Sequence, residues 1–438
     1  MKKNIFTLAA TVAFVLASNA QKVDFEEYDL TNGMHVILHQ DNTAPIVTTS
    51  VMYHVGAKDE EPDRTGMAHF FEHLLFEGTK NIKKGDWFKI VSSNGGTNNA
   101  NTTDDRTYYY EVFPSNNLEL GLWMESERLM HPVIKQEGVD TQNEVVKEEK
   151  RLRVDNQPYS RFLENVKKHM FKKHPYKGTT IGKMEHLDAA TLDEFLAFNK
   201  KFYIPNNATL VVAGDINIEE TKRLIKAYFG PIPKGKNIIR NFPKEAPIEK
   251  EFKAKAYDPN IQIPAIVAAY RTPSMKTRDA RVLDMISTYL SSGKSSVLYK
   301  KLVDKKKMAF QAGAFNLSQE DYGTYILYAL PLGANTLDDL IKEIDVEIDK
   351  IQNELISEKS FQKLQNKFEN DFVNSNSNIE GIANSLARFN VLYGNTNLIN
   401  TEIDIYRSIT REEIKTVAQK YLNKKQRLVM EYLPESKK

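Results

Sequence analysis

The chain has 438 residues, no cysteine and a formal net charge of +2, from 60 basic and 58 acidic side chains. This length is too great for one ordinary hydrophobic core, so two or more domains are expected. The near balance of charge gives no electrostatic case for nucleic-acid binding, which usually needs a clearly basic face. Disulfides, iron–sulfur clusters and thiol catalysis are excluded, so any metal must be held by histidine and carboxylate side chains.

Residues 1–20 have the pattern of a secretory signal peptide. Two lysines follow Met1, residues 5–17 are mostly apolar, and small residues stand where a signal peptidase reads the chain. The apolar run is too short to span a bilayer well, and no later stretch is long and apolar enough, so the mature chain is expected to have no membrane span. We expect cleavage before Gln21 and export, which in a double-membraned bacterium means the periplasm.

Residues 21–230 predict one α+β domain. An Asn-Gly pair at 32–33 between two strand-like runs is a strong hairpin signal. Hydrophobic periodicity predicts further strands at 46–55, 108–112 and 209–213, and helices at 66–77, 118–130 and 142–153. Strands grouped with long helices favour α+β layers over a parallel βαβ array.

A Pro-rich, charged stretch over residues 231–250 predicts a linker, and residues 251–438 repeat the first half faintly. Strands are predicted at 265–270, 325–329 and 428–432, and helices at 279–290, 337–357 and 359–374. The repetition indicates an internal duplication, giving two similar α+β domains of mixed or antiparallel sheet packed with helices. All nine histidines lie at or before His186, so only the first domain is expected to hold a histidine-ligated metal.

The segment His69-Phe70-Phe71-Glu72-His73 carries the strongest chemical signal. On a helix, His69 and His73 lie four residues apart, so both imidazoles point to one side and can bind one zinc ion. Glu72 lies at the edge of the same face, where it can take a proton from a metal-activated water. The alternative is a helix with two neutral histidines and no metal, because a short motif also arises by chance.

A third ligand is expected from another helix, which offers three candidates. Glu144, Glu148 and Glu149 are all acidic, and helices often carry such residues as solvated charge. The two valines at 145–146 mark the predicted buried side, and Glu149 lies about one turn further on, so it can turn inward. Periodicity alone does not exclude Glu148.

The histidine motif followed by Glu149 resembles the pitrilysin, or insulinase, family of inverted-zincin metallopeptidases, which includes insulin-degrading enzyme and the mitochondrial processing peptidase. The resemblance covers nearly the whole mature chain. It implies a zinc-dependent endopeptidase with one Zn²⁺ per chain, held by His69, His73 and Glu149, with Glu72 as general base. The family often has a further glutamate seven residues before the ligand glutamate. Here Gln142 stands at that position, which leaves its role open.

Residues 95–102, followed by residues 107–109, are similar to the edge-strand motif of the same family. An extended peptide substrate could add itself beside Asn99, Ala100 and Thr102 through main-chain hydrogen bonds, which suits broad peptide specificity. Without the resemblance, an ordinary loop rich in Asn and Thr is an equally good interpretation.

The second half departs from the pattern of active family members, which offer an Arg and, seven residues later, a Tyr to steady the substrate and its oxyanion. At the matching positions stand Val297, which has no donor, and Asp304, which only accepts. One explanation is a heterodimer in which a homologous subunit supplies the Arg and Tyr, similar to the mitochondrial processing peptidase and some bacterial relatives. The other is that Arg271 or Tyr299 of this chain serves instead.

The predicted function is therefore zinc-dependent hydrolysis of exported or periplasmic peptides. The alternatives are a non-catalytic structural subunit and a subunit that captures peptides without cutting them. Structural subunits of this family usually lose part of the zinc motif, which is intact here. A capturing subunit would keep its peptide affinity after Glu72→Gln and show no turnover.

Overall fold

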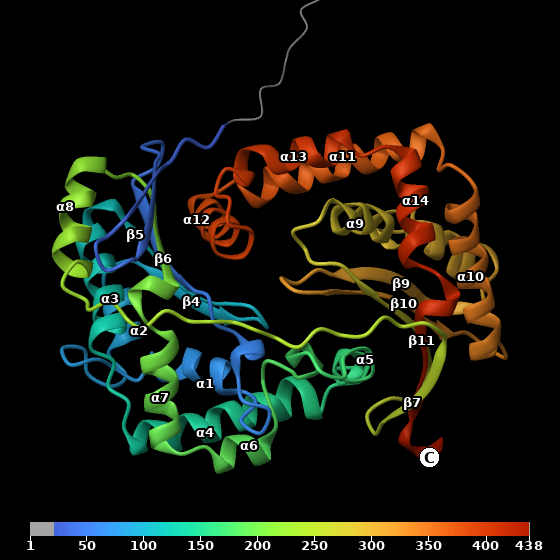
Figure 1. Ribbon diagram of the computed structural model, residues 1–438, viewed down its shortest axis with the longest axis horizontal. Coiled ribbons are helices and arrows are strands. Elements are labelled where there is room, and N and C mark those ends of the chain that lie inside the picture. Colours follow the sequence, from blue (N-terminus) through green and yellow to red (C-terminus); the bar gives the residue numbers. More distant parts are fainter. Residues whose placement is uncertain (1–21, 438) are drawn as a thin grey trace, which may run out of the picture.

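The computed structural model describes residues 22–437, so the predicted signal peptide lies outside the described residues. The described chain forms two mixed β-sheets, each packed with helices (Figure 1). The prediction of an α+β fold with two similar halves is confirmed. Among the described residues, no helix combines the length and apolarity needed to cross a bilayer.

The first half contains a six-stranded sheet in the order β1-β2-β6-β3-β5-β4. Its strands are β1 (Glu26–Asp29), β2 (His35–Gln40), β3 (Ile46–Tyr53), β4 (Thr97–Thr102), β5 (Thr107–Pro114) and β6 (Ala208–Gly214). β2 and β6 are parallel, and the other neighbours are antiparallel. The predicted hairpin joins β1 to β2, where Gly33 adopts the positive φ of 85° that disfavours any residue with a Cβ.

The second half contains a five-stranded sheet in the order β7-β11-β8-β10-β9. Its strands are β7 (Phe252–Asp258), β8 (Ala265–Thr272), β9 (Ala309–Leu317), β10 (Gly323–Pro331) and β11 (Arg427–Pro434). β7 and β11 are parallel, and the other pairs are antiparallel. Apart from β1, this sheet repeats the order and strand directions of the first, as the predicted duplication requires.

Helices follow the strands in matching positions in the two halves. The first half has α1 (Met67–Leu74), α2 (Trp87–Ser93), α3 (Leu118–Met130), α4 (Gln136–Lys150), α5 (Phe162–Met170), α6 (Met184–Ala189), α7 (Leu192–Phe202) and α8 (Ile218–Phe229). The second half has α9 (Arg278–Ser291), α10 (Leu337–Asn353), α11 (Glu358–Ser375), α12 (Ile379–Arg388), α13 (Leu398–Ser408) and α14 (Arg411–Tyr421). Like α1 after β3, α9 follows β8, so α9 takes the place that α1 holds in the first half.

Each half covers part of the other half's sheet. α12 packs on β3 and β6 of the first sheet, where Ile382 and Leu386 bury against Ile37 and Val211 (Figure 1). In the opposite direction, α5 packs on β8 and β11 of the second sheet. Because α12 and α5 each bury apolar surface on the sheet of the other half, the hydrophobic effect stabilises the contact between the halves.

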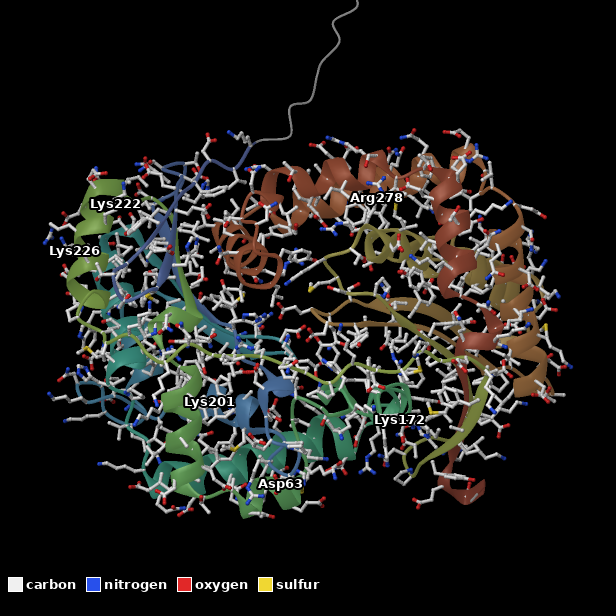
Figure 2. The ribbon with its side chains drawn as sticks, viewed as in Figure 1. Asp63, Lys172, Lys201, Lys222, Lys226 and Arg278 are labelled. Atoms are coloured by element: carbon white, nitrogen blue, oxygen red, sulfur yellow. The ribbon has the colours of Figure 1, made fainter. Side chains whose placement is uncertain are left out.

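A long segment without helix or strand connects the halves between α8 and β7 and crosses the middle of the molecule in Figure 1. Charged side chains cover the outside, as Figure 2 shows for Lys222 and Lys226 on the outer side of α8. Many of them pair with opposite charges. Lys222 lies 2.8 Å from Glu26, and Arg278 at the start of α9 lies 2.6 Å from Glu413. The surface therefore mixes both signs of charge.

Candidate metal centre

Helix α1 presents the two motif histidines from a tightly fixed N-terminus. Gly66 stands before the helix with a φ of 94°, and the Glu60 carboxylate accepts hydrogen bonds from the backbone N–H groups of Gly66 and Ala68, both at 2.8 Å. Burial raises the pKa of Glu60, and the two hydrogen bonds from the backbone oppose this rise. On the opposite face, Phe70 and Phe71 are fully buried, so the histidines are turned towards the cleft.

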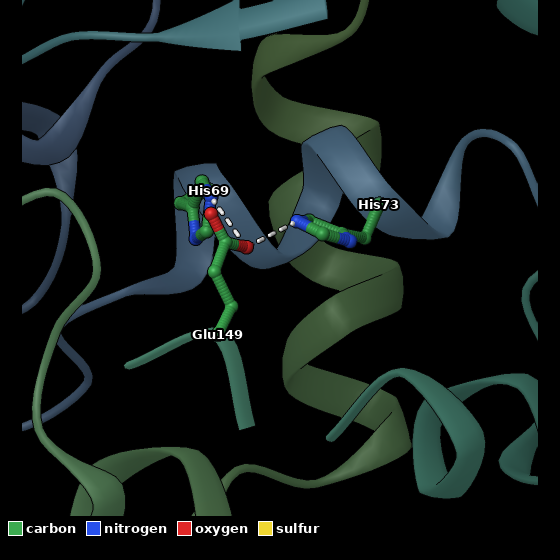
Figure 3. Close-up of side chains that lie close together, drawn as sticks. All are labelled: His69, His73 and Glu149. Atoms are coloured by element: carbon green, nitrogen blue, oxygen red, sulfur yellow. Dashed lines mark ion pairs between the residues drawn. The ribbon is translucent and has the colours of Figure 1, made fainter. Parts of the chain in front are cut away.

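His69, His73 and Glu149, the three zinc ligands that the resemblance implies, lie close together. The Glu149 carboxylate reaches from α4 towards both imidazoles of α1 (Figure 3). Its Oε2 lies 3.2 Å from His73 Nε2 and 3.6 Å from His69 Nε2. Among the described residues, these three form the group whose ligand atoms all lie within 4.8 Å of one another.

The spacing of these atoms fits a zinc ion. Tetrahedral zinc with ligands at about 2.0–2.1 Å sets neighbouring ligand atoms roughly 3.3 Å apart. The two Glu149–histidine distances, 3.2 and 3.6 Å, lie on either side of that value. Two imidazoles and one carboxylate are also the donor set of a catalytic zinc site that leaves a fourth position open.

The ionisation of His69 and Glu149 suits metal binding, which needs neutral imidazole and charged carboxylate. Burial, followed by the charge of His73, lowers the pKa of His69 to about 4. A hydrogen bond from His73 is the main cause that lowers the pKa of Glu149. His69 is therefore neutral and Glu149 ionised at neutral pH.

The other acidic candidates on α4 face water. Glu144 is 68% exposed beside Lys147, and Glu148 is 56% exposed beside Arg151, so neither approaches the histidines. The expectation that both valines mark the buried side is wrong in part. Val146 is fully buried, but Val145 is 44% exposed, because adjacent helix residues point about 100° apart.

Glu72 is held by the neighbouring edge strand. Thr102, the last residue of β4, donates a hydrogen bond of 2.6 Å from Oγ1 to Glu72 Oε2. Burial raises the pKa of Glu72, while the Thr102 hydrogen bond opposes this rise. Thr102 is predicted to contact substrate, and no local pattern in the sequence indicates that its hydroxyl reaches Glu72 from a different element.

The candidate substrate-binding residues line the same cleft as the metal cluster. The cleft has a volume of about 690 Å³, and Asn99, Ala100 and Thr102 of β4 line it together with His69 and Glu72. β4 pairs with β5 along one side and is the last strand of its sheet, so in the described structure its other edge carries no strand. An unpaired edge of this kind can accept an extended peptide.

Gln142, which stands where the family often has a glutamate, lies next to the carboxylate of another residue. Its side-chain amide donates a hydrogen bond of 2.6 Å to Glu77 Oε1, just beyond the end of α1. Glu77 is 10% exposed and pairs with Lys84 at 2.8 Å. A negative charge thus lies next to Gln142, although position 142 itself is uncharged.

The second half contributes no side chain to the cleft among the described residues, since all those that line it lie between His69 and Gly182. Val297 packs against the core of the second half. Asp304 and Tyr299 lie on one π-helical turn, Tyr299–Lys305. Arg271 donates hydrogen bonds to the backbone oxygens of Ala246 and Met170. Neither Arg271 nor Tyr299 therefore stands beside the cluster.

Two family profiles match the chain in succession. The one described as Insulinase (Peptidase family M16) matches residues 35–183, and the one described as Peptidase M16 inactive domain matches residues 189–368. The chain therefore belongs to the insulinase, or M16, family of peptidases, which confirms the resemblance found in the sequence.

Individual relatives agree with this assignment. The zinc protease PqqE of Helicobacter pylori is 31% identical over 370 residues, which cover 82% of each chain. A probable mitochondrial-processing peptidase subunit beta of Arabidopsis thaliana is 22% identical over 405 residues, covering 90% of this chain and 75% of the relative. The crystal structure of a protease from Helicobacter pylori matches with a TM-score of 0.88 and 27% identity, covering 94% of this chain and 99% of that chain.

Proposed function

We propose that this chain is a zinc-dependent endopeptidase, with His69, His73 and Glu149 as ligands of one Zn²⁺ and Glu72 as general base. The observation that carries the proposal is the convergence of three ligand atoms beside Glu72, in a cleft bordered by the edge of β4. The Helicobacter pylori relative, which is 31% identical to this chain, is itself named a zinc protease.

The chain's own residues divide the work of hydrolysis. A bound zinc ion would act as a Lewis acid and lower the pKa of a water molecule beside it. Glu72 takes the proton of the attacking water and returns it to the leaving amine, while Thr102 holds its carboxylate in place. Main-chain groups of Asn99 and Ala100 bind the peptide as an added strand. No protein nucleophile is needed, so no covalent intermediate is expected.

We further propose that the active form is a heterodimer with a homologous subunit that supplies an Arg and a Tyr. Val297 and Asp304 cannot donate to an oxyanion, and the described cleft is lined by the first half alone. Loss of one oxyanion donor can cost about 2.7–4 kcal/mol of transition-state stabilisation, so the missing donors matter for the rate. The plant relative, which is named as a subunit, is consistent with this division.

The domain assignment and location belong to the same proposal. Residues 21–230 would form the zinc-bearing domain and residues 251–438 its metal-free homologue, joined by a linker at 231–250. The signal-peptide pattern of residues 1–20 supports export of the mature chain, which in a double-membraned bacterium would mean the periplasm. Its substrates would then be exported or periplasmic peptides.

A second candidate is a subunit that binds peptides, or supports an assembly, without cutting. The same missing donors at positions 297 and 304 favour it. Cleavage of a quenched fluorescent peptide separates the candidates, using the mature chain alone and mixed with a co-encoded homologue that carries the Arg and Tyr.

We expect cleavage in the mixture and its loss with Glu72→Gln. Equal cleavage by the chain alone would remove the partner and keep the peptidase. Zinc binding without cleavage in either preparation would overturn the peptidase proposal.

A further inference from the structure

The two carboxylate oxygens of Glu149 have different partners. Oε2 faces His69 and His73, as described above, whereas Oε1 lies 2.9 Å from an Nη atom of Arg153. The guanidinium group therefore holds the oxygen that does not face the histidines. This contact is an ion pair, and its attraction favours the orientation of the carboxylate in which Oε1 faces Arg153 and Oε2 faces the histidines.

Arg153 stands on an unusual piece of backbone. Residues Arg151–Asp155 continue α4 as a π-helical turn, in which the N–H of Asn156 donates to the oxygen of Arg151 at 2.9 Å. Such π turns are rare and often occur at functional sites. Arg153 also lines the cleft that contains His69, His73 and Glu149.

A purely structural role does not explain this arginine. Its side chain is 77% exposed, so it contributes little packing, while the Glu149 side chain that it holds is only 16% exposed. An exposed ion pair of this kind adds little to folding stability. What Arg153 does affect is the position of the Glu149 carboxylate.

We infer that Arg153 is a positioning residue of the metal site, a role that rests on the proposed zinc ligation by Glu149. By occupying Oε1, Arg153 makes Glu149 present a single oxygen, Oε2, towards the histidines. A carboxylate that bound through both oxygens would use the position that a catalytic zinc site keeps for water. Groups that orient a ligand in this way typically change metal affinity about 10- to 100-fold.

The second half supports this turn, although none of its described side chains lines the cleft. The Asn260 side-chain amide donates a hydrogen bond of 2.6 Å to the backbone oxygen of Asp155. The Asp155 carboxylate pairs with Lys150 and Arg161 at 2.8 and 2.9 Å. The turn that carries Arg153 is therefore fixed from both sides.

The test is the zinc dissociation constant of the full mature chain, measured by competition with a chromophoric chelator. Arg153→Gln removes the charge, and Arg153→Lys keeps the charge with a single donor nitrogen. Arg151→Gln is the matched control, because Arg151 lies on the same turn but pairs with the exposed Glu148 at 3.1 Å. The melting temperature of each metal-free variant checks the fold.

We expect Arg153→Gln to weaken zinc binding about 10- to 100-fold, with Arg153→Lys in between and Arg151→Gln within twofold of the wild type. The melting temperatures of the metal-free proteins should agree. Equal zinc affinity of wild type and Arg153→Gln would overturn the inference and leave the zinc site intact. A wild-type chain that binds no zinc would overturn the proposed function itself.

Discussion

Helices α1 and α9 hold equivalent places in the two halves but carry different chemistry. On α1, Glu72 accepts a hydrogen bond from Thr102 at the end of the edge strand β4. On α9, Asp284 accepts one of 2.9 Å from Asn316 near the end of the edge strand β9. Both halves thus keep an acid on the helix that is held by the edge strand.

The halves differ in what stands beside this acid. The first half has His69, His73 and Glu149, whereas the second half has Arg281 paired with Glu402 at 2.8 Å. Arg281 and Glu402 form a nearly buried salt bridge. Because their opposite charges neutralise each other, no metal is needed there. At this place the first half therefore has a candidate set of metal ligands and the second half has a salt bridge, and a few side chains make the difference.

The first prediction has the largest expected effect and compares the two acids directly. Glu72→Gln should lower kcat for peptide cleavage about 10²- to 10⁴-fold, because it removes the proton acceptor. The matching Asp284→Asn should leave kcat unchanged. Both are measured under the conditions in which the wild type cleaves. An equal loss in both variants would contradict the division between the halves.

The second prediction concerns the salt bridge of the second half. Arg281→Met should lower the free energy of unfolding by about 3–5 kcal/mol, because it leaves Glu402 buried without its cation. Zinc content should stay at one ion per chain. Arg278→Met serves as control, since the side chains of its pair with Glu413 are 41% and 34% exposed and such a surface pair is worth at most about 1 kcal/mol. Equal effects of the two substitutions in urea unfolding would refute the buried role of Arg281.

The third prediction is a pH dependence that belongs to the second half. Burial raises the pKa of Asp284 from 3.8 to about 6. Between pH 4 and 6, Asp284 is ionised in the unfolded chain but still protonated in the folded chain. The free energy of unfolding therefore falls as the pH rises through this range, and the raised pKa has no effect on it below about pH 4. Asp284→Asn should gain stability relative to wild type between pH 4 and 7, by about 3 kcal/mol in total.

Unfolding curves at a series of pH values measure this difference, with the exposed Asp304→Asn as control. The gain of Asp284→Asn should level off above about pH 6. A difference between Asp284→Asn and wild type that does not change with pH would show that Asp284 is not perturbed by its surroundings.

The fourth prediction has the smallest expected effect and tests the edge strand. Thr102→Val removes the hydrogen bond to Glu72 and should lower kcat about tenfold, with little change in KM or zinc content. Thr102→Ser keeps the hydroxyl and should restore most of the rate. Thr97→Val, at the exposed start of β4, is the control. If Thr102→Ser were as slow as Thr102→Val, the hydroxyl would not be the group that matters.

Local patterns predicted much of the first half. The Asn-Gly turn, the run before Tyr53 and the helix with His69 each follow from periodicity or turn chemistry, which act within a few residues. The prediction of 118–130 as a helix agrees with α3 at both ends. The helix with Glu149 is less well predicted, because it begins six residues before the predicted start and changes to a π turn at Arg151.

Other features depend on contacts that no local pattern contains. Periodicity shows that a helix such as α12 has an apolar face, but not that this face covers the sheet of the other half. The strand β9 was not predicted, because its sequence from Ala309 to Leu317 mixes small, polar and aromatic residues without strict alternation. Similarly, nothing near Glu72 in the sequence indicates Thr102, and nothing near Glu149 separates Arg153 from its exposed neighbours.

The most direct test of zinc ligation at this cluster is a crystal structure of the mature chain grown with zinc, with anomalous data collected at the zinc absorption edge. We expect one strong peak per chain, about 2.0–2.2 Å from His69 Nε2, His73 Nε2 and one oxygen of Glu149. A peak at other residues, or no peak at this cluster, would contradict it.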